Sequence, residues 1–301
     1  MVSMEQMRTC CRNVEIREHV RLDAYTTLRV GGEADGFAEP ENEAQLSSLF
    51  RAARETATPV LLLGNGSNTL VRDGGFRGLA IHLGKRFAAV EVRGDSVSAQ
   101  AGALLSTLAR TARDACLTGL EFAQGIPGTV GGGVFMNAGA YGGELGAHIV
   151  SVRVLDGEEI RDVPAADMAF SYRHSRAMEE GWVILGALFR LEAGDGAAID
   201  AAMRDYAARR KEKQPLEFPS AGSFFKRPAG HFAGQLIEEA GLKGKAVGGA
   251  QVSEKHAGFL INRGGATAAD FLALKELVQE EVYRRFGVRL EPEVRIVGEK
   301  A

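Results

Sequence analysis

The chain is poor in residues that hold metals or form disulfides. Only three of its 301 residues are cysteines, Cys10, Cys11 and Cys116. Their spacing matches no metal site, and adjacent cysteines are poorly placed for a structural disulfide. The six histidines form no pair at positions i and i+4, which disfavours a zinc or iron site. We therefore expect no metal and a reducing compartment, the cytoplasm.

Long hydrophobic runs are missing as well. No stretch reaches the roughly 18 uninterrupted apolar residues that a transmembrane helix needs. Residues 1–22 carry charges every few positions and contain no apolar region like that of a signal peptide. We expect a protein that does not associate with a membrane.

A surplus of basic charge is also absent. Lysine and arginine total 36 residues, aspartate and glutamate total 39, and the formal net charge is −3 at pH 7. No local run of lysine and arginine offsets this balance, so no positive field exists to hold a polyanion. We expect no nucleic-acid partner. The hydrophobic content of 45% over this length does allow a sizeable core and two or three domains.

Glycine is abundant, with 38 residues, and it gathers in two loops. We call residues 64–68 the first glycine loop and residues 125–133 the second glycine loop. Each loop leaves backbone N–H groups unobstructed, so together they are suited to grip a pyrophosphate without a lysine or a metal. This pattern predicts a bound dinucleotide. The candidate cofactor-binding residues are Gly64, Asn65, Gly66, Ser67 and Asn68, followed by Gly125, Ile126, Pro127, Gly128, Gly131 and Gly132.

Two familiar nucleotide motifs do not fit these loops. A Rossmann loop runs directly into a helix, whereas here the next predicted strand, at residues 79–83, follows too soon for a helix to intervene. A Walker A loop is excluded because Gly244-Lys245-Ala246 lacks the upstream glycine and the hydroxyl residue after lysine. Either glycine loop alone is typical of a tight turn. The presence of two, each beside an apolar strand-like run, favours the dinucleotide interpretation.

Hydrophobic periodicity predicts alternating helices and strands. The predicted helices cover residues 41–57, 104–116, 197–213, 235–240 and 268–286. The predicted strands cover residues 60–63, 79–83, 149–155, 183–191, 249–252, 259–262 and 288–297, with a hairpin over 90–100 around Gly94-Asp95. Period-2 alternation indicates a mixed sheet, and the charged run 211–215 with its proline indicates a domain boundary. We expect the residues after that boundary to form a small α+β lobe.

Several further patterns, one before the glycine loops and four after them, occur in a fixed order, and together they carry a resemblance. They are Tyr25-Thr26-Thr27-Leu28-Arg29-Val30-Gly31-Gly32, Tyr172-Arg173-His174-Ser175, Ala221-Gly222-Ser223-Phe224-Phe225-Lys226-Arg227-Pro228, Val252-Ser253-Glu254-Lys255-His256-Ala257-Gly258-Phe259 and Leu290-Glu291-Pro292-Glu293-Val294-Arg295. With these patterns the chain resembles the UDP-N-acetylenolpyruvoylglucosamine reductase family. These flavoenzymes complete UDP-N-acetylmuramate for bacterial peptidoglycan.

The resemblance implies a fold and two cofactors. The fold is α+β, with a two-lobed FAD-binding region of the vanillyl-alcohol-oxidase type and a smaller α+β C-terminal substrate lobe. FAD is the bound cofactor and NADPH is the reductant that leaves before the enolpyruvyl nucleotide enters. The implied domains are an N-terminal extension over 1–20, FAD-binding lobes over 21–85 and 86–214, and the substrate lobe over 215–301.

The resemblance also implies three catalytic residues. Hydride transfer from flavin N5 to the vinyl carbon leaves negative charge beside the substrate carboxylate, and Arg173 matches the cation that stabilises it. Ser223 matches the family's proton donor, and Glu293 matches a glutamate that shares a proton or orients the serine. The ordinary alternatives are a surface ion pair for Arg173, a turn or helix cap for Ser223 and a solvated strand position for Glu293.

The family divides by an inserted loop that carries a substrate-clamping tyrosine, and this chain has no room for it between Pro228 and His231. The chain therefore resembles the short subgroup. We expect Tyr172, Lys226, Arg227 and His256 to bind the substrate. The expected partners are small molecules, NADPH and UDP-N-acetylglucosamine-enolpyruvate, and we expect a monomer.

Two other functions stay open at this stage. A flavin-dependent oxidase of the same FAD-binding fold would pass electrons to oxygen, and such enzymes often tether FAD through histidine or cysteine. Neither residue closely flanks the two glycine loops. A nucleotide-binding or scaffold module, in which the glycines only form turns, is the non-enzymatic alternative.

Overall fold

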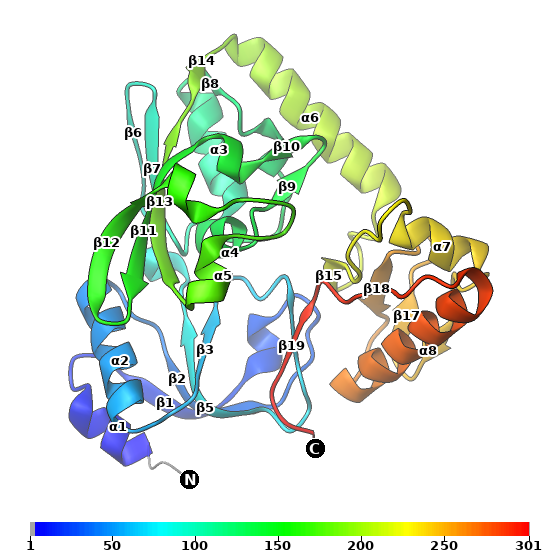
Figure 1. The fold of residues 1–301 in the computed structure, drawn as a ribbon, viewed down its shortest axis with the longest axis horizontal. Coiled ribbons are helices and arrows are strands. Elements are labelled where there is room, and N and C mark those ends of the chain that lie inside the picture. Colours follow the sequence, from blue (N-terminus) through cyan, green and yellow to red (C-terminus); the bar gives the residue numbers. More distant parts are fainter. Residues whose placement is uncertain (1–3, 301) are drawn as a thin grey trace. The chain divides into compact units, whose positions relative to one another are not determined.

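The computed structural model describes residues 4–300 and mixes helices with strands throughout, which confirms the predicted α+β class (Figure 1). The chain forms two compact units. Unit 1 contains the described residues up to Arg17, then Phe37–Asn65 and Leu79–Arg209. Unit 2 contains Glu18–Gly36, Gly66–Gly78 and the described residues from Arg210 onward. The first glycine loop is thus shared between units, and the N-terminal extension, the two FAD-binding lobes and the substrate lobe expected from the resemblance stay a prediction.

A four-stranded sheet has the order β1-β2-β5-β3, and the division between units falls inside β1, β2 and β5. In unit 1, β3 and β5 run parallel, with Leu63 paired to His82. Helix α2 begins where the Asn42 side chain accepts from the Gln45 backbone N–H, a typical helix cap. The bounds are α1 Met4–Cys10, β1 Ile16–Arg21, β2 Glu33–Ala38, α2 Glu43–Glu55, β3 Val60–Leu63 and β5 Phe76–His82.

The second sheet of unit 1 has five strands in the order β12-β11-β13-β7-β6, and each neighbouring pair is antiparallel. The predicted hairpin is confirmed, because Arg93 pairs with Ser96 around Gly94-Asp95. Helices α3 and α4 contribute apolar side chains to the same core as this sheet. The bounds are β6 Val90–Arg93, β7 Ser96–Gln100, α3 Leu105–Asp114, α4 Val130–Phe135, β11 Ile149–Asp156, β12 Glu159–Pro164 and β13 Val183–Arg190.

Short elements connect these parts of unit 1. Two small antiparallel pairs, β9 with β10 and β8 with β14, lie outside the five-stranded sheet. The bounds are β8 Leu117–Thr118, β9 Gly139–Ala140, β10 Gly143–Glu144, α5 Arg176–Glu180 and β14 Glu192–Ala193, with 3-10 helices at Lys85–Phe87, Glu121–Ala123, Leu145–Ala147 and Ala165–Met168. Sequence periodicity missed most of them because segments of two to five residues are too short to show a period.

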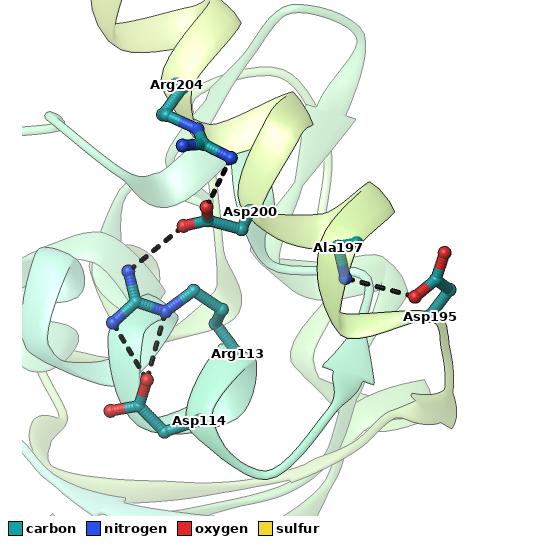
Figure 2. Close-up of polar contacts among 6 residues, drawn as sticks. All are labelled: Arg113, Asp114, Asp195, Ala197, Asp200 and Arg204. Atoms are coloured by element: carbon teal, nitrogen blue, oxygen red, sulfur yellow. Dashed lines mark hydrogen bonds and ion pairs between the residues drawn. The ribbon is translucent and has the colours of Figure 1, made fainter.

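Helix α6 (Gly196–Lys213) is joined to α3 by the Arg113–Asp200 ion pair, which Figure 2 shows. Asp200 contacts Arg204 of its own helix at 2.7 Å and Arg113 of α3 at 3.4 Å. Asp195 accepts from the Ala197 backbone N–H at 3.0 Å and so satisfies a donor at the helix start. The predicted helix over 197–213 is confirmed.

Unit 2 contains a four-stranded sheet in the order β15-β18-β17-β16, all antiparallel, and a separate parallel pair of β4 and β19. Helices α7 and α8 contribute to its core, whose largest buried side chains include Phe224 and Phe271. The bounds are β4 Thr69–Val71, β15 Ser220–Ser223, α7 Ala233–Glu239, β16 Ala246–Val247, β17 Ala250–Val252, β18 Phe259–Asn262, α8 Ala268–Phe286 and β19 Arg295–Val297, with a 3-10 helix at Leu22–Tyr25.

The start of α8 is held by carboxylates from two parts of unit 2. Thr267 and Asp270 form a capping box, and the two carboxylate oxygens of Asp73 accept from the backbone N–H groups of Ala268 and Ala269, both at 2.8 Å. Asp73 thereby fixes the turn after β4 to the C-terminal helix.

The strand predicted over residues 288–297 is wrong in extent, because only Arg295–Val297 forms a strand, β19. Pro292 has no N–H and interrupts a regular ladder. The preceding residues instead make isolated bonds: the Lys226 N–H donates to Glu291 O at 2.8 Å, and the Glu293 N–H donates to Phe224 O at 2.9 Å. This irregular pairing brings Glu293 beside the segment that carries Ser223.

Candidate functional site

The two glycine loops contact each other within unit 1. The Asn65 Nδ2 donates to the Pro127 carbonyl at 2.6 Å. A Cβ at Gly64 would collide with Thr129 Oγ1, so only glycine allows this approach. The contact joins a residue at the end of β3 to a residue before α4.

The second glycine loop ends in a capped helix start. The Thr129 side chain accepts from the Gly132 N–H at 3.5 Å, and the Val130 and Gly131 N–H groups donate to Ala103 and Ala101 carbonyls at 2.7 and 2.8 Å. These bonds fix the loop to the segment between β7 and α3. Gly125, Pro127 and Gly132 remain exposed, so the loop presents main chain at the surface.

The first glycine loop has main-chain donors available for a ligand. Gly66 has φ +58°, and a Cβ there would collide with the Tyr25 carbonyl, so its conformation requires glycine. Among residues 4–300, the backbone N–H groups of Asn65, Gly66 and Ser67 meet no acceptor. Such consecutive free N–H groups are typical of an anion-binding loop.

The residues around the two glycine loops fit FAD. Main-chain N–H groups suit a diphosphate, and the buried Gln124 Oε1 next to the second glycine loop, an acceptor with no hydrogen-bond partner, suits an N–H or O–H group elsewhere on the cofactor. In the part of the chain that the structure describes, no group of three or more histidine, cysteine or acidic side chains could hold a metal ion. The residues present therefore fit a dinucleotide cofactor bound by main chain.

Arg173 lies in unit 1 at the tip of a tight turn. Ser171 and His174 exchange backbone hydrogen bonds of 3.2 and 3.1 Å, and Arg173 between them has φ +55°. Its Nη2 donates to the Gly139 carbonyl at 3.3 Å, and its Cζ lies 5.0 Å from the centre of the exposed Tyr172 ring. The half-buried guanidinium is thus held next to the β9–β10 hairpin.

Ser223 and Glu293 lie in unit 2, on neighbouring segments. Ser223 is exposed at the end of β15 and pairs with Phe259. The next residue, Phe224, accepts the backbone bond from Glu293. Asn68 of the first glycine loop donates from Nδ2 to the Glu293 carbonyl at 3.1 Å. Unit 2 therefore brings one end of the first glycine loop next to both predicted catalytic residues.

The two candidate phosphate-binding cations are exposed and already have neighbours. Lys226 Nζ lies 3.4 Å from the Glu291 carboxylate, and the Arg227 guanidinium lies 4.0 Å from the centre of the Phe232 ring. An exposed ion pair of this kind contributes only about 0–1 kcal/mol. A more highly charged ligand therefore competes readily with Glu291 for Lys226.

His256 is more buried, and burial lowers the pKa of its imidazole below the ordinary value of 6.5. Its Nδ1 accepts from the Gly258 N–H at 3.1 Å, and its ring packs edge-on against Phe259 at 5.0 Å. The ring is therefore neutral at pH 7, with its proton on Nε2. A neutral ring donates a hydrogen bond to phosphate but does not neutralise its charge.

Sequence reasoning assigned no role to three residues beside the turn that carries Arg173. Asn137 and Ser175 are polar and fully buried, and Tyr141 of the β9–β10 hairpin stacks on Tyr206 of α6 with centroids 4.5 Å apart. The run from Asn137 to Gly143 contains three glycines and one tyrosine, a mixture that could have marked a third loop.

The predicted residues fall into two sets, one in each unit. Unit 1 carries Gly64, Asn65, Gly125, Ile126, Pro127, Gly128, Gly131, Gly132, Tyr172 and Arg173. Unit 2 carries Gly66, Ser67, Asn68, Ser223, Lys226, Arg227, His256 and Glu293. No helix of the described residues is long and apolar enough to cross a membrane.

Two family models match the chain in consecutive parts. Residues 34–160 match the FAD binding domain. Residues 214–297 match the C-terminal domain of UDP-N-acetylenolpyruvoylglucosamine reductase. The predicted combination of an FAD-binding region and a separate C-terminal domain is confirmed.

Similar proteins match over nearly the full chain. The UDP-N-acetylenolpyruvoylglucosamine reductase of Limosilactobacillus fermentum is 48% identical over 301 residues, covering 100% of both chains. That of Levilactobacillus brevis is 49% identical over 298 residues, covering 99% of this chain and 98% of the relative. The crystal structure of UDP-N-acetylenolpyruvylglucosamine reductase from Thermus caldophilus is similar, with 37% identity, a TM-score of 0.82 and coverage of 94% and 98%.

Proposed function

The chain belongs to the UDP-N-acetylenolpyruvoylglucosamine reductase family, and on this basis we propose that it reduces UDP-N-acetylglucosamine-enolpyruvate to UDP-N-acetylmuramate with NADPH as reductant. It is an oxidoreductase with an FAD-binding domain. The observation that carries the proposal is the 48% identity to a reductase along all 301 residues. The comparisons therefore favour the reductase over the flavin oxidase.

The two glycine loops would hold the FAD diphosphate. The free N–H groups of Asn65, Gly66 and Ser67 suit its oxygens, and the Asn65–Pro127 bond keeps the second loop beside the first. Main-chain dipoles provide this binding without a cation, which leaves the basic residues for the substrates. When bound, FAD supplies the hydride for the vinyl carbon of the substrate.

Arg173 would stabilise the charge that develops on the substrate. Hydride addition to the vinyl carbon places negative charge on the adjacent carbon and its carboxylate. A guanidinium is permanently charged and binds a carboxylate through two parallel N–H bonds, so it stabilises this charge more than that of the starting enolpyruvyl group. The turn and the Gly139 carbonyl already hold the Arg173 side chain, which reduces the reorganisation that binding requires.

Ser223 would donate the proton that completes the reduction. Its exposed hydroxyl is uncharged and protonated at neutral pH. A serine hydroxyl is a weak acid, so the transfer requires a strongly basic substrate carbanion and a nearby cation, for which Lys226 is suited three residues along the chain. Glu293, whose backbone is bonded to Phe224, would orient the serine or share its proton.

Tyr172, Lys226, Arg227 and His256 would bind the UDP-sugar. Lys226 and Arg227 supply positive charge for the diphosphate, and neutral His256 supplies a hydrogen bond from Nε2. Tyr172, with 56% of its surface exposed beside Arg173, is suited to pack against the substrate.

The cellular setting follows from this substrate. The product is a peptidoglycan precursor, so we propose a role in cell-wall biogenesis, and with it in cell shape and division. The cysteine content agrees with a cytoplasmic enzyme. We also propose that the protein is a monomer. The proposed domains are an N-terminal extension over 1–20, FAD-binding lobes over 21–85 and 86–214, and a substrate lobe over 215–301.

Anaerobic kinetics test the proposed function directly. The purified protein is expected to be yellow, to release free FAD on heating and to lose its flavin colour when NADPH is added. Adding UDP-N-acetylglucosamine-enolpyruvate without oxygen should then restore the colour rapidly and yield UDP-N-acetylmuramate. Reoxidation by oxygen alone would identify an oxidase, and a colourless protein without FAD would support the non-enzymatic module.

A further inference from the structure

Asn137 is a fully buried amide whose two ends bind two different segments of unit 1. Its Nδ2 donates to the Ser171 carbonyl at 3.1 Å, and its Oδ1 accepts from the Gly146 N–H at 2.9 Å. Its φ is +43°, a left-handed conformation that asparagine tolerates better than most residues. A buried amide with both ends bonded is a rigid connector.

The segment that Asn137 holds is the turn that carries Arg173. Arg173 is also left-handed, at φ +55°, and a strained residue of this kind persists only where its surroundings hold it. Asn137 holds the turn through Ser171. Fully buried Ser175 holds the other side, donating from Oγ to the Phe135 carbonyl at 2.7 Å.

Both anchors connect the turn to the end of α4, the helix that begins in the second glycine loop: Asn137 follows the helix by two residues, and Ser175 donates to Phe135, its last residue. The Asn137 N–H donates to Val134 O at 3.1 Å, and the Ala138 N–H donates to Gly133 O at 2.8 Å, so the helix backbone fixes the amide. The Arg173 guanidinium reaches the Gly139 carbonyl two residues further on. The turn and the cofactor loop are therefore attached to one short stretch of backbone.

From this network we infer that Asn137 is a positioning residue, which sets the place of the Arg173 guanidinium relative to the second glycine loop. The inference rests on the proposed function of Arg173. An arginine that must meet one carboxylate beside a bound flavin needs a fixed distance from the flavin loop, and a displacement of about 1 Å can cost roughly 100-fold in rate. Asn137 and Ser175 provide that fixed distance.

The variant Asn137→Asp tests the inference in the FAD-bound enzyme. Aspartate has the same size, tolerates positive φ and keeps the acceptor for the Gly146 N–H, but an ionised carboxylate cannot donate to the Ser171 carbonyl. Reoxidation of NADPH-reduced flavin by UDP-N-acetylglucosamine-enolpyruvate should slow about 10- to 100-fold. Reduction by NADPH and the Kd of FAD should change less than about 2-fold, because neither uses Arg173.

The pH dependence of this variant, compared between the two half-reactions, separates positioning from general damage. A protonated aspartate regains an O–H donor for Ser171, so its reoxidation deficit should shrink as the pH falls and grow as the pH rises. General damage from the buried charge would follow the same pH dependence, but it would slow reduction by NADPH as much as reoxidation. A deficit that is constant with pH, or equal in both half-reactions, would therefore overturn the inference.

Asn262→Asp is the matched control. Asn262 is a buried amide of unit 2 that donates to Leu28 O at 3.0 Å and accepts from the Gly264 N–H at 2.9 Å. The same chemical change there should lower stability but leave the ratio of the two half-reaction rates within about 2-fold of wild type. If it changed that ratio as much as Asn137→Asp, the inference would fail.

Two further variants cover the remaining outcomes. If Asn137→Asp does not fold, Ser175→Ala tests the inference instead, because loss of the second anchor should slow reoxidation selectively and to a smaller extent.

Arg173→Ala separates the inference from the proposed function. If Arg173→Ala slows reoxidation but both anchor variants leave it unchanged, the inference alone is wrong. If Arg173→Ala leaves reoxidation fast, the proposed role of Arg173 is wrong, and the inference falls with it.

Discussion

The Asn68 side-chain amide donates a 3.1 Å hydrogen bond to the backbone carbonyl of Glu293. The Arg295 N–H donates to the Asn68 carbonyl at 2.9 Å, so Asn68 is bonded to the Glu293 segment through both its side chain and its main chain. One residue of the first glycine loop therefore supports a candidate cofactor site and a candidate catalytic residue.

Asn68→Ala should affect both FAD binding and the reoxidation half-reaction through these contacts. Loss of the side-chain bond frees the loop and the backbone of Glu293, and an unpaired carbonyl at a partly buried site costs about 1–3 kcal/mol. We expect the Kd of FAD to rise and flavin reoxidation by the enolpyruvyl nucleotide to slow, each about 10-fold. Flavin fluorescence titration and anaerobic stopped-flow measure the two effects.

Asn65→Ala is the matched control for Asn68→Ala. It removes the 2.6 Å bond between the two glycine loops but touches no predicted catalytic residue. We expect a similar rise in the Kd of FAD, with the reoxidation rate of the FAD-saturated enzyme within about 2-fold of wild type. A selective loss of reoxidation in Asn65→Ala would contradict this division of roles.

Lys226 should bind the substrate diphosphate and release Glu291 when it does so. The pair is exposed, and the Nζ–Oε2 distance is 3.4 Å. Lys226→Ala should raise KM for the UDP-sugar about 10-fold and KM for NADPH much less, because charge-assisted bonds to phosphate contribute about 1.5–3 kcal/mol. Steady-state kinetics with each substrate varied in turn measures both constants.

Glu291→Gln provides the opposite change at the same ion pair. Removing the carboxylate leaves Lys226 without a competing anion, so KM for the UDP-sugar should fall or stay constant. A rise in KM comparable to that of Lys226→Ala would mean that the ion pair, and not the lysine charge, serves the site.

Segments with a regular hydrophobic period could be predicted from the sequence. Residues 268–286 were predicted as a helix, and α8 has the same bounds. The hairpin at Gly94-Asp95 and the strand at 60–63 were also predictable, because turn residues and apolar runs define them locally. The sequence did not predict that Glu18–Gly36 and Gly66–Gly78 group with the C-terminal residues, because no local pattern indicates which distant segments pack together.

In the candidate site, too, local features could be predicted from the sequence and long-range contacts could not. The glycine loops were found because glycine itself marks an unusual backbone. Asn137 was not found, because its bond to Ser171 joins residues 34 positions apart and depends on burial that the sequence does not display. The irregular pairing around Pro292 was missed because alternation over 288–297 is typical of a strand even where a proline breaks the ladder.

Asp73 should stabilise unit 2 by capping α8. Its carboxylate accepts two backbone N–H groups at 2.8 Å, where the positive end of the helix dipole favours a negative charge. Asp73→Ala should lower the free energy of unfolding by about 1–2 kcal/mol. Asp205→Ala, which removes only an exposed ion pair to Arg209 on α6, should cost less than about 0.5 kcal/mol. Urea unfolding with saturating FAD measures both, and equal losses would contradict the capping role.

His256 should make the folded protein less stable in mild acid. Burial lowers its pKa in the folded state, so between that pKa and the ordinary value of 6.5 the unfolded chain binds more protons than the folded chain. Stability therefore rises with pH through this window, and it falls as the pH drops below 6.5.

The variant His256→Asn tests this prediction, because it keeps an acceptor for the Gly258 N–H but removes the titration. Urea unfolding over a pH series gives the free energy of unfolding of wild type and variant. The two should depend on pH in the same way above neutral pH, whereas below it wild type should lose stability that the variant retains. Parallel curves throughout would show that His256 does not cause the acid sensitivity.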